Sequence, residues 1–396
     1  MPRVVAVVSA ILLTLVACWR PTPPPVRTGP PITTAPLIPI TLPPTTTTLP
    51  SIEVTLDGAT PELTEAVASL YGYAAGLPVL PPAPEPLIES LRNAGVSNRY
   101  LRGSATVNEV AGVRIAVVEI GTDVIGAAES EKGWMIVAAR LDSLLIDPYW
   151  GRKHWQLLVV GSDARPGQKV LKSRADSLHI VALDGTGKGA VVGIPRDSWV
   201  SIPGHGKGKI NSSLALGGPE LMMDTFENVT EINLDGYLVT GFAGFIDLIT
   251  VLGGLDIDVP IRVRDSAAHA NISKGRQTLN GKEALAFSRA RKTLARGDLT
   301  RQEHGGLVLL AAIAMVRTSG PSALPDLLAR AKPFIETDLP PGDLLAFSLA
   351  AVDAQHKRIK NIVVSARIGQ VGAASVVFLN AAAFDTFEDL KDGDLD

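Results

Sequence analysis

Short apolar runs alternate with amphipathic stretches from residue 154 to the end of the chain, and this alternation restricts the fold more than any other feature. Five runs have the length and composition of buried strands: WQLLVVGSDAR, DSLHIVALDG, GAVVGIPRD, IKNIVVSAR and ASVVFLNA. Apolar residues recur with helical spacing at 218–229, 242–252, 280–289 and 299–317. Strands interleaved with helices predict an α/β layered domain with a central mixed sheet, over residues 151–396.

Composition limits the class of partner. A length of 396 residues is enough for two or three domains. Apolar residues make up 46% of the chain but aromatic residues only 5%, so the core must be mostly aliphatic. The formal net charge is −3, which predicts no nucleic-acid partner. Any anion site must therefore be a local cluster of arginines rather than a basic face.

The first 18 residues have the pattern of an export signal. Arg3 is followed by fourteen mostly apolar residues, Val4 to Ala17. At about 1.5 Å per residue this run spans ~21 Å, which is less than the ~30 Å hydrocarbon core of a bilayer and favours a signal peptide. The sequence LVAC, which ends at Cys18, resembles a bacterial lipobox. We expect lipidation of Cys18 and anchoring to the outer face of the cytoplasmic membrane; a plain secretory signal and an uncleaved anchor helix are the alternatives.

Residues 19–50 have the composition of a linker. Eleven prolines and nine threonines lie between positions 21 and 50, without apolar periodicity, so this stretch cannot form a packed core. A proline-rich chain rises ~3.1 Å per residue, so the linker reaches up to ~90 Å from its anchor.

Residues 51–150 are predicted to form a small α+β accessory module. TPELTEAVASLYGYAAG favours a helix with Thr60 at the N-cap and Pro61 at the first helical position. VRIAVVEIG and GWMIVAARL favour two strands of a hairpin or meander. No motif in this module indicates a chemistry.

Several common catalytic motifs are absent from the sequence. It contains no G-x-S-x-G, no H-E-x-x-H and no cysteine after Cys18. GHGKGKIN, at 204–211, resembles a phosphate-binding loop but lacks the order G-x-x-x-x-G-K-[ST]. These absences argue against a serine hydrolase, a zinc enzyme and an ATPase.

Aspartates and arginines instead follow or precede the predicted strands. The charged strand ends are Asp163 with Arg165, Arg174 with Asp176, and Arg196 with Asp197; predicted helices add Arg289, Arg291, Arg296, Asp298 and Arg301. Ligands of open α/β sheets bind at such strand ends. Arginines bind phosphate oxygens bidentately and paired carboxylates hold Mg²⁺, so the set suits a pyrophosphate with a divalent metal. Each pair taken alone is more often a surface ion pair, which contributes about 0–1 kcal/mol.

Six segments, in order, resemble the LytR-CpsA-Psr (LCP) family. They are GSDAR, RADS, GIPRDSWVSIPGHGKGKINSSLALGG, DGYLVTGFAGFIDLITVLGGLDIDVP, LNGKEALAFSRAR and GDLTR. The resemblance begins near residue 155 and implies an LCP-type fold. It also implies a Mg²⁺-dependent phosphotransferase that moves a glycopolymer, such as teichoic acid or arabinogalactan, from undecaprenyl pyrophosphate to peptidoglycan through a phosphodiester. The prenyl chain is expected in an apolar tunnel between sheet and helices, with the pyrophosphate at its charged mouth.

The resemblance also assigns roles to residues. Asp163 and Asp176 match metal-binding aspartates. The positions that it implies for the pyrophosphate are Arg165, Arg174, Arg196, Arg289, Arg291, Arg301, Lys209 and Asn211, with Lys209 and Asn211 also expected to fix their loop. Arg196 and Asp298 are the expected catalytic residues, Asp298 as a base.

The sequence departs from the family pattern after GDLTR. The family usually continues with an arginine and a glutamine in the next helical turn, where this chain has His304 and Gly305. A glycine in mid-helix costs about 1 kcal/mol relative to alanine and supplies no side chain. Two alternatives to the transferase therefore stay open: a polyprenyl-pyrophosphate phosphatase, and a non-catalytic protein that binds polyprenyl phosphate or acts as an envelope scaffold.

Overall fold

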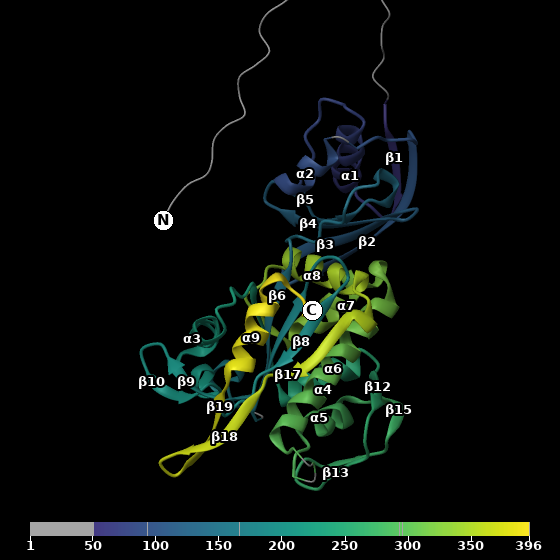
Figure 1. The fold of residues 1–396 in the computed structure, drawn as a ribbon. Coiled ribbons are helices and arrows are strands. Elements are labelled where there is room, and N and C mark those ends of the chain that lie inside the picture. The colour runs from purple at the N-terminus through teal and green to yellow at the C-terminus, as the bar shows by residue number, and fades with distance from the viewer. Residues whose placement is uncertain (1–50, 93, 166, 293, 295, 396) are drawn as a thin grey trace, which may run out of the picture. The chain divides into compact units, whose positions relative to one another are not determined.

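The computed structural model describes residues 51–92, 94–165, 167–292, 294 and 296–395 (Figure 1). The predicted signal segment, the linker and Cys18 lie outside these residues. The secondary structure confirms a mixed α/β fold.

The N-terminal part of the described chain is a five-stranded sheet with two helices. The sheet has the order β1 (Glu53–Asp57), β2 (Tyr100–Val110), β3 (Val113–Ile120), β4 (Asp123–Ser130) and β5 (Gly133–Arg140). The helices are α1 (Pro61–Ala74) and α2 (Glu85–Leu91). Thr60 caps α1 as predicted, because its hydroxyl accepts a hydrogen bond from Leu63 N at 3.3 Å. The two predicted strands exist but are not neighbours, since β4 lies between them in the sheet.

A six-stranded mixed sheet forms the centre of the rest of the chain. Its order is β16 (Glu336–Thr337), β11 (Gly236–Gly241), β6 (Trp155–Ser162), β7 (Ala175–Leu183), β8 (Gly189–Gly193) and β17 (Ile359–Val363). Strand β7 is antiparallel to both of its neighbours, β6 and β8, whereas β11 is parallel to β6 and β17 is parallel to β8. Because helices cover both faces, these strands are almost uniformly apolar rather than alternating.

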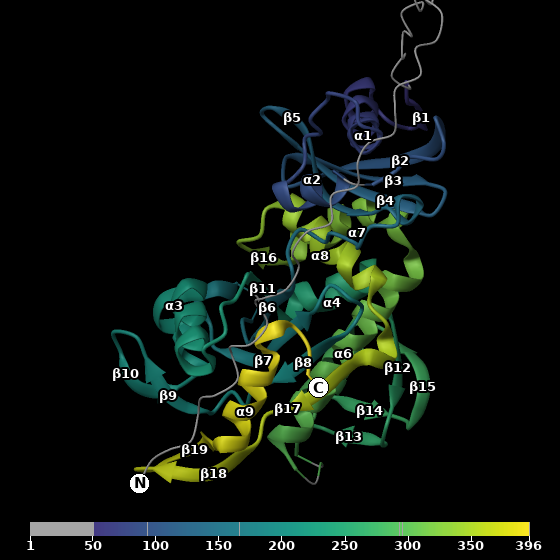
Figure 2. The same cartoon turned by 45° about the horizontal axis from the view of Figure 1, so that its top comes forward.

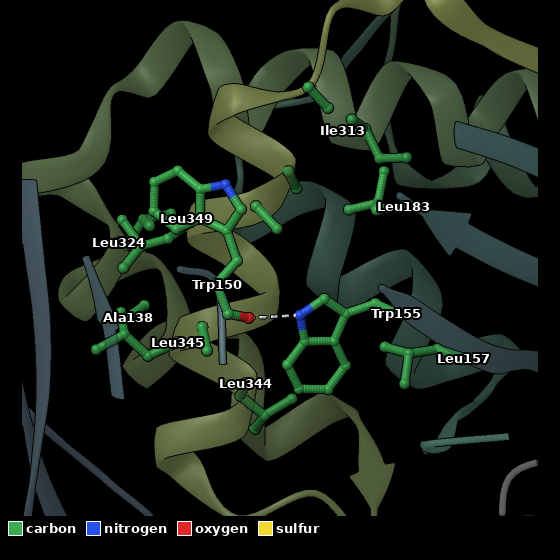
Figure 3. Packing of buried hydrophobic residues seen from close by; sticks show 14 of the residues in the cluster. Ala138, Trp150, Trp155, Leu157, Leu183, Ile313, Leu324, Leu344, Leu345 and Leu349 are labelled. Carbon is green, nitrogen blue, oxygen red and sulfur yellow. Dashed lines mark hydrogen bonds between the residues drawn. The ribbon is translucent and has the colours of Figure 1, made fainter. Parts of the chain in front are cut away.

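Alternate residues of each strand pack against different helices, which makes three layers (Figure 2). Leu158, Ile180 and Val192 belong to a core with α3 (Ser212–Thr230) and α9 (Ala381–Asp389). Leu157, Val181 and their same-face neighbours pack on α6 (Asp298–Ser319), α7 (Leu324–Ala331) and α8 (Pro341–Asp353). Figure 3 shows part of this second core, where Trp155 Nε1 donates a hydrogen bond of 2.7 Å to Trp150 O.

Two further helices complete the helical layer beside β11. They are α4 (Phe242–Val251), which directly follows β11, and α5 (Gly281–Arg289), which packs on α4 and α6. Asn280 and Glu283 form a capping box that starts α5. The remaining strands pair in small sheets: β9 (Trp199–Ile202) with β10 (Gly206–Lys209), β12 (Leu255–Val259) with β15 (Gly275–Leu279), β13 (Val263–Asp265) with β14 (Ala270–Ile272), and β18 (Ala366–Val371) with β19 (Ala374–Leu379).

Membrane-spanning potential was also assessed over the described residues. None of their helices alone has the length and apolar character to cross a bilayer, although α6 and the segment Pro321–Phe334 satisfy both criteria as a pair bent by 106°.

Candidate functional site

The charged ends of β6, β7 and β8 meet at one edge of the central sheet. Because the three strands are antiparallel in turn, the end of β6 and the end of β8 both lie beside the start of β7. A β-bulge between Gly161 and Ser162 leaves Asp176 as an extra residue of β7. Beyond the bulge, Asp163 N donates to Arg174 O at 2.9 Å, which holds Asp163 beside the start of β7. The predicted convergence of strand ends is therefore present.

The turn after β8 fixes the backbone of Arg196. Asn211 N donates to Arg196 O at 3.2 Å, and Asn211 O accepts from Ala175 N at the same distance. Lys209 Nζ lies 2.8 Å from Asp197 Oδ1, so Asp197 pairs with the neighbouring hairpin strand β10. Lys209 and Asn211 thus hold the loop that carries Arg196.

A partly buried ion-pair network joins this turn to α6. Asp176 Oδ1 accepts hydrogen bonds from Arg196 Nη1 and, at 3.1 Å, from Arg301 Nη1. Asp298 Oδ1 lies 2.9 Å from Arg301 Nη2 and 3.9 Å from Arg196 Nε. The Arg301 side chain is only 4% exposed. The Nε atoms of both arginines are buried and have no hydrogen-bond partner among the described residues.

Helix α5 supplies another arginine to the same place. Arg289 is the last residue of α5, and its guanidinium lies 4.3 Å from the centre of the Phe242 ring. Beyond α5, Asp265 accepts hydrogen bonds from Arg291 N at 2.8 Å and from Lys292 N at 2.9 Å. These hydrogen bonds fix the backbone of Arg291 and Lys292, which are two more cationic residues of the site.

These side chains line a cavity of about 210 Å³, which we call the charged pocket. Its lining contains six cationic residues and three carboxylates: Arg165, Arg196, Arg289, Arg291, Lys292 and Arg301 with Asp163, Asp176 and Asp265. The excess of cations suits a polyanion. Lys292 and Asp265 had no signal in the sequence, because neither lies at a predicted strand end.

Burial and like charge both act on these arginines. Burial lowers the pKa of Arg301, of Arg196 and of Arg289. The nearby Arg301 guanidinium lowers the pKa of the other two further. A guanidinium stays protonated in proteins, so the positive charges of Arg196, Arg289 and Arg301 repel one another. A bound anion would reduce this repulsion.

An apolar cavity of about 230 Å³ opens from the charged pocket. Asp176, Phe242, Arg289 and Arg301 line both. Most of the remaining lining comes from apolar side chains of β6, β11, α4 and α6. A further cavity of about 210 Å³ shares part of this lining and extends it between the sheet and α6, α7 and α8; the shared residues are Val159, Leu238, Leu248, Leu309, Ala312 and Ile335. We call this further space the inner cavity.

Four of the predicted site residues do not line the charged pocket. Arg174 is exposed; its carbonyl accepts a hydrogen bond from Asp163 N, and its side chain has no hydrogen bond or ion pair with the other described residues. Lys209 and Asn211 lie behind the pocket in the Arg196 loop. Asp298 contacts the arginines rather than the pocket itself. Their roles in binding and catalysis stay predictions.

The predicted metal ligands Asp163 and Asp176 both line the charged pocket. The described residues contain no group of three or more His, Cys, Asp or Glu side chains able to hold a metal ion. Two carboxylates are nevertheless compatible with Mg²⁺, which commonly takes one or two protein oxygens and completes its shell with phosphate and water. The Asp163 side chain has no hydrogen bond or ion pair with the other described residues, so one carboxylate is free for such an ion.

The two residues that depart from the family pattern are both buried in α6. The His304 ring stacks on Phe287, with centroids 4.2 Å apart. Gly305 lines the apolar cavity against His179 of β7, where an added Cβ would lie 2.7 Å from His179 Cε1.

Comparison with known proteins gives a consistent result. The LytR_cpsA_psr family model matches residues 137–392. The "polyisoprenyl-teichoic acid–peptidoglycan teichoic acid transferase TagV" of Bacillus subtilis is 35% identical over 200 residues, which are 48% of this chain and 50% of TagV. The "probable cell wall biosynthesis protein LcpB" of Corynebacterium glutamicum is 33% identical over 156 residues, which are 36% of this chain and 37% of that protein. The chain thus matches about half the length, or less, of these relatives.

Solved structures share the fold. The crystal structure of B. subtilis TagV superposes with a TM-score of 0.53 and 30% identity, covering 60% of this chain and 95% of that one. The structure of TagT bound to LI-WTA superposes with a TM-score of 0.51, over 62% of this chain and 92% of that one. Because the sequences are only 24% identical, this similarity is evidence for a shared fold and for nothing further.

Proposed function

Because the chain belongs to the LytR_cpsA_psr family, we propose that it is a phosphotransferase of the bacterial cell envelope. Its substrate would be an anionic glycopolymer linked to undecaprenyl pyrophosphate, and its acceptor peptidoglycan. The product would be a phosphodiester between the two. The relative TagV, which is named as a polyisoprenyl-teichoic acid–peptidoglycan teichoic acid transferase, supports this reaction class.

One observation carries the proposal: the charged pocket opens directly into an apolar cavity. Arg289 and Arg301 line both spaces, so an anion held by them has an apolar path beside it. A polyprenyl pyrophosphate has this division, with a charged head and a long apolar tail.

The proposed chemistry is electrostatic. Arg196, Arg289 and Arg301 bind the pyrophosphate and stabilise the charge that builds on the departing polyprenyl phosphate. A hydroxyl of the acceptor attacks the sugar-side phosphorus, the bond between this phosphorus and the bridging oxygen breaks, and the hydroxyl proton passes to the departing lipid phosphate, whose prenyl tail lies in the apolar cavity. Asp298 contacts Arg301 and Arg196, which favours an orienting role for it over proton abstraction.

We also propose Mg²⁺ as the cofactor, held by Asp163 and Asp176. When bound it would supply further neutralisation of phosphate charge. Asp176 would then serve the ion and two arginines at once, because only its Oδ1 is occupied by them.

The proposed location follows from residues 1–50. The apolar run before Cys18 and the Pro/Thr-rich stretch after it suit export, a lipid anchor and a tether outside the membrane. Metabolic labelling with a fatty acid, compared between the native chain and Cys18→Ala, tests this part of the proposal: no difference in label contradicts the lipoprotein.

A ligation assay tests the reaction. The full-length chain in detergent is incubated with a lipid-pyrophosphate glycan, a peptidoglycan oligomer and Mg²⁺, and products are identified by mass spectrometry. We expect a cross-linked glycan, and a loss of at least about 100-fold with Arg196→Ala or Asp176→Ala, because the first removes a proposed phosphate ligand and the second removes the carboxylate that orients Arg196 and Arg301. Arg296→Ala, at an exposed arginine outside the pocket, is the matched control.

The other outcomes separate the alternatives. Free phosphate-ended glycan with no cross-link would identify a phosphatase. Binding of polyprenyl phosphate with no turnover would identify a binding protein. Normal ligation rates in both variants would refute the electrostatic mechanism.

A further inference from the structure

Two polar side chains of β7 lie in the wall of the apolar cavity, next to the charged pocket. Ser177 and His179 both line this cavity, where Asp176, Arg289 and Arg301 form the boundary with the pocket. Because they are two residues apart on one strand, Ser177 and His179 face the same side of the sheet. A neighbouring polar pair in a mostly apolar wall calls for an explanation.

Ser177 differs from the other hydroxyl-bearing residues of that wall. Ser288 donates to Leu285 O of its own helix at 3.0 Å, and Thr240 donates to Phe334 O at the same distance. The Ser177 hydroxyl lies 3.3 Å from His179 Nδ1 and has no other hydrogen-bond partner among the described residues. Its O–H is therefore not tied to the backbone and can turn from Nδ1 toward an acceptor in the cavity.

The surroundings of His179 fix which atom carries the proton. His179 is 1% exposed, and its Nε2 lies 2.9 Å from Gln302 O. A carbonyl oxygen only accepts, so Nε2 must be the donor and Nδ1 of the neutral ring must be an acceptor. Ser177 consequently donates its proton to Nδ1 in the free protein.

Gly305 makes room for this pair. A Cβ at position 305 would lie 2.7 Å from His179 Cε1 and 3.2 Å from Ser177 Oγ. At this point of the wall α6 contributes no side chain, and the strand supplies the polar groups instead.

We propose that Ser177 binds the lipid-side phosphate of the substrate and that His179 is the positioning residue that controls its hydroxyl. This inference rests on the proposed function. A phosphate held by Arg289 and Arg301, with its tail in the apolar cavity, lies at the boundary that Ser177 lines.

Donation to a phosphate oxygen changes the state of His179. When Ser177 turns its O–H toward the phosphate, Nδ1 is left as a buried acceptor without a donor, which is costly. A proton taken from solvent then converts the ring to imidazolium: Nδ1–H donates to Ser177 Oγ while Nε2–H still donates to Gln302 O. The charged groups facing this site are Asp176 on β7, Arg301 on α6 and Arg289 on α5, and the phosphate offsets the two arginines.

Binding of two short prenyl probes to the full-length chain tests the pair. One probe is farnesol, and the other is methyl farnesyl phosphate. This phosphodiester lacks the second ionisation, near pH 6, of a phosphomonoester, so its charge is constant in the assay. We expect Ser177→Ala to weaken binding of the diester about 10-fold or more and to leave farnesol binding unchanged. Ser288→Ala, in the same cavity wall, is the matched control for both probes.

The pH dependence tests His179. Because the bound state holds one more proton, affinity for the diester must rise as the pH falls from about 7 to about 5, while farnesol affinity stays constant. His179→Asn retains a polar group near the Nδ1 position but cannot become cationic. In this variant we expect the pH dependence of diester binding to disappear.

The results distinguish this inference from the proposed function. If the native chain binds both probes and Ser177→Ala behaves like Ser288→Ala, only the inference is overturned. The same holds if Ser177→Ala weakens both probes equally, or if His179→Asn retains the native pH dependence. A native chain that binds neither probe contradicts the proposed function itself.

Discussion

Asp176 shows how single residues set the charge of this site. One of its oxygens accepts hydrogen bonds from Arg196 and Arg301, whose buried Nε atoms lack hydrogen-bond partners among the described residues. Buried donors without partners are uncommon in native proteins and are costly when nothing completes them. We infer that a bound polyanion completes this set, since neutral ligands would leave the excess positive charge in place.

His179 gives a prediction for stability against pH. Burial lowers the pKa of this histidine to about 4, from about 6.5 in the unfolded chain. The unfolded state therefore binds more protons than the native state between these values, so the free energy of unfolding must fall as the pH falls from about 6.5 toward 4. We expect the native chain to lose up to ~3 kcal/mol more than His179→Asn over this range.

Urea unfolding curves at several pH values measure this loss. Comparison with the variant removes the contribution of the other titrating groups, including His304, whose pKa burial also lowers. Parallel pH profiles for the native chain and His179→Asn would show that His179 is not the group responsible.

At this scale the sequence predicted the pocket residues at strand ends and the arginines in and after the predicted helices, but missed Lys292 and Asp265. Asp163, Asp176 and Arg196 follow or precede apolar runs, so position along the chain identified them. Lys292 reaches the pocket because Asp265, far away in sequence, binds its backbone N–H, and no local pattern reports such a bond.

Among the secondary structure elements, those specified by local sequence were predicted and those that depend on tertiary pairing were not. The helices predicted at 242–252, 280–289 and 299–317 are α4, α5 and α6, because apolar spacing and caps are local properties. The bulge at Gly161 and Ser162, which makes Asp176 the extra residue in the ladder, depends on how two strands pair and was not predictable. The helix predicted at 218–229 starts earlier, at Ser212, and contains a break at Gly218, where φ is +84°.

The contact between α4 and α5 gives the second prediction. A Cβ at Gly281 would lie 2.2 Å from Ile246 O of α4, and a backbone carbonyl within a helix cannot move aside cheaply. Gly281→Ala must therefore push the two helices apart, with a cost of about 1–3 kcal/mol. Because Arg289 ends α5 and touches Phe242 at the start of α4, we also expect weaker binding of the anionic probe.

Lys282→Ala is the matched control, since Lys282 is the adjacent α5 residue and is exposed. Thermal unfolding and probe binding are measured on both variants. Equal stability of the two would mean that α4 and α5 are not held as closely as the structure has them.

On the scale of the whole molecule, the N-terminal sheet and the central domain share a core. Residues of β3, β4 and β5 belong to the same buried cluster as α8, with Ile115, Ala138, Leu345 and Leu349 among its members. Arg140 of β5 also pairs with Asp353 of α8 at 2.8 Å. Local composition predicted a separate module up to residue 150. The shared core could not be predicted in this way, because it is made by segments some 200 residues apart and local composition does not report such contacts.

The shared core predicts that the central domain depends on the N-terminal sheet. A chain that begins at residue 151 would expose the α8 face carrying Leu345 and Leu349, and each newly exposed side chain of this size costs about 1.5–3 kcal/mol. We expect its midpoint of thermal unfolding to lie at least about 10 °C below that of a chain that begins at residue 51.

Circular dichroism and calorimetry on the two chains give the comparison. The longer chain should unfold in one transition, because a common core couples its parts. Arg140→Ala, which removes the surface ion pair but leaves the apolar contact, should change the midpoint by only a few degrees, since partly exposed ion pairs contribute about 0–1 kcal/mol. The longer chain could instead unfold in two transitions, with the later one at the midpoint of the shorter chain. This result would mean that the N-terminal sheet folds independently of the central domain. The dependence of the domain on residues 51–140 would then have to be abandoned, and the sequence-based boundary at residue 150 would describe the molecule better.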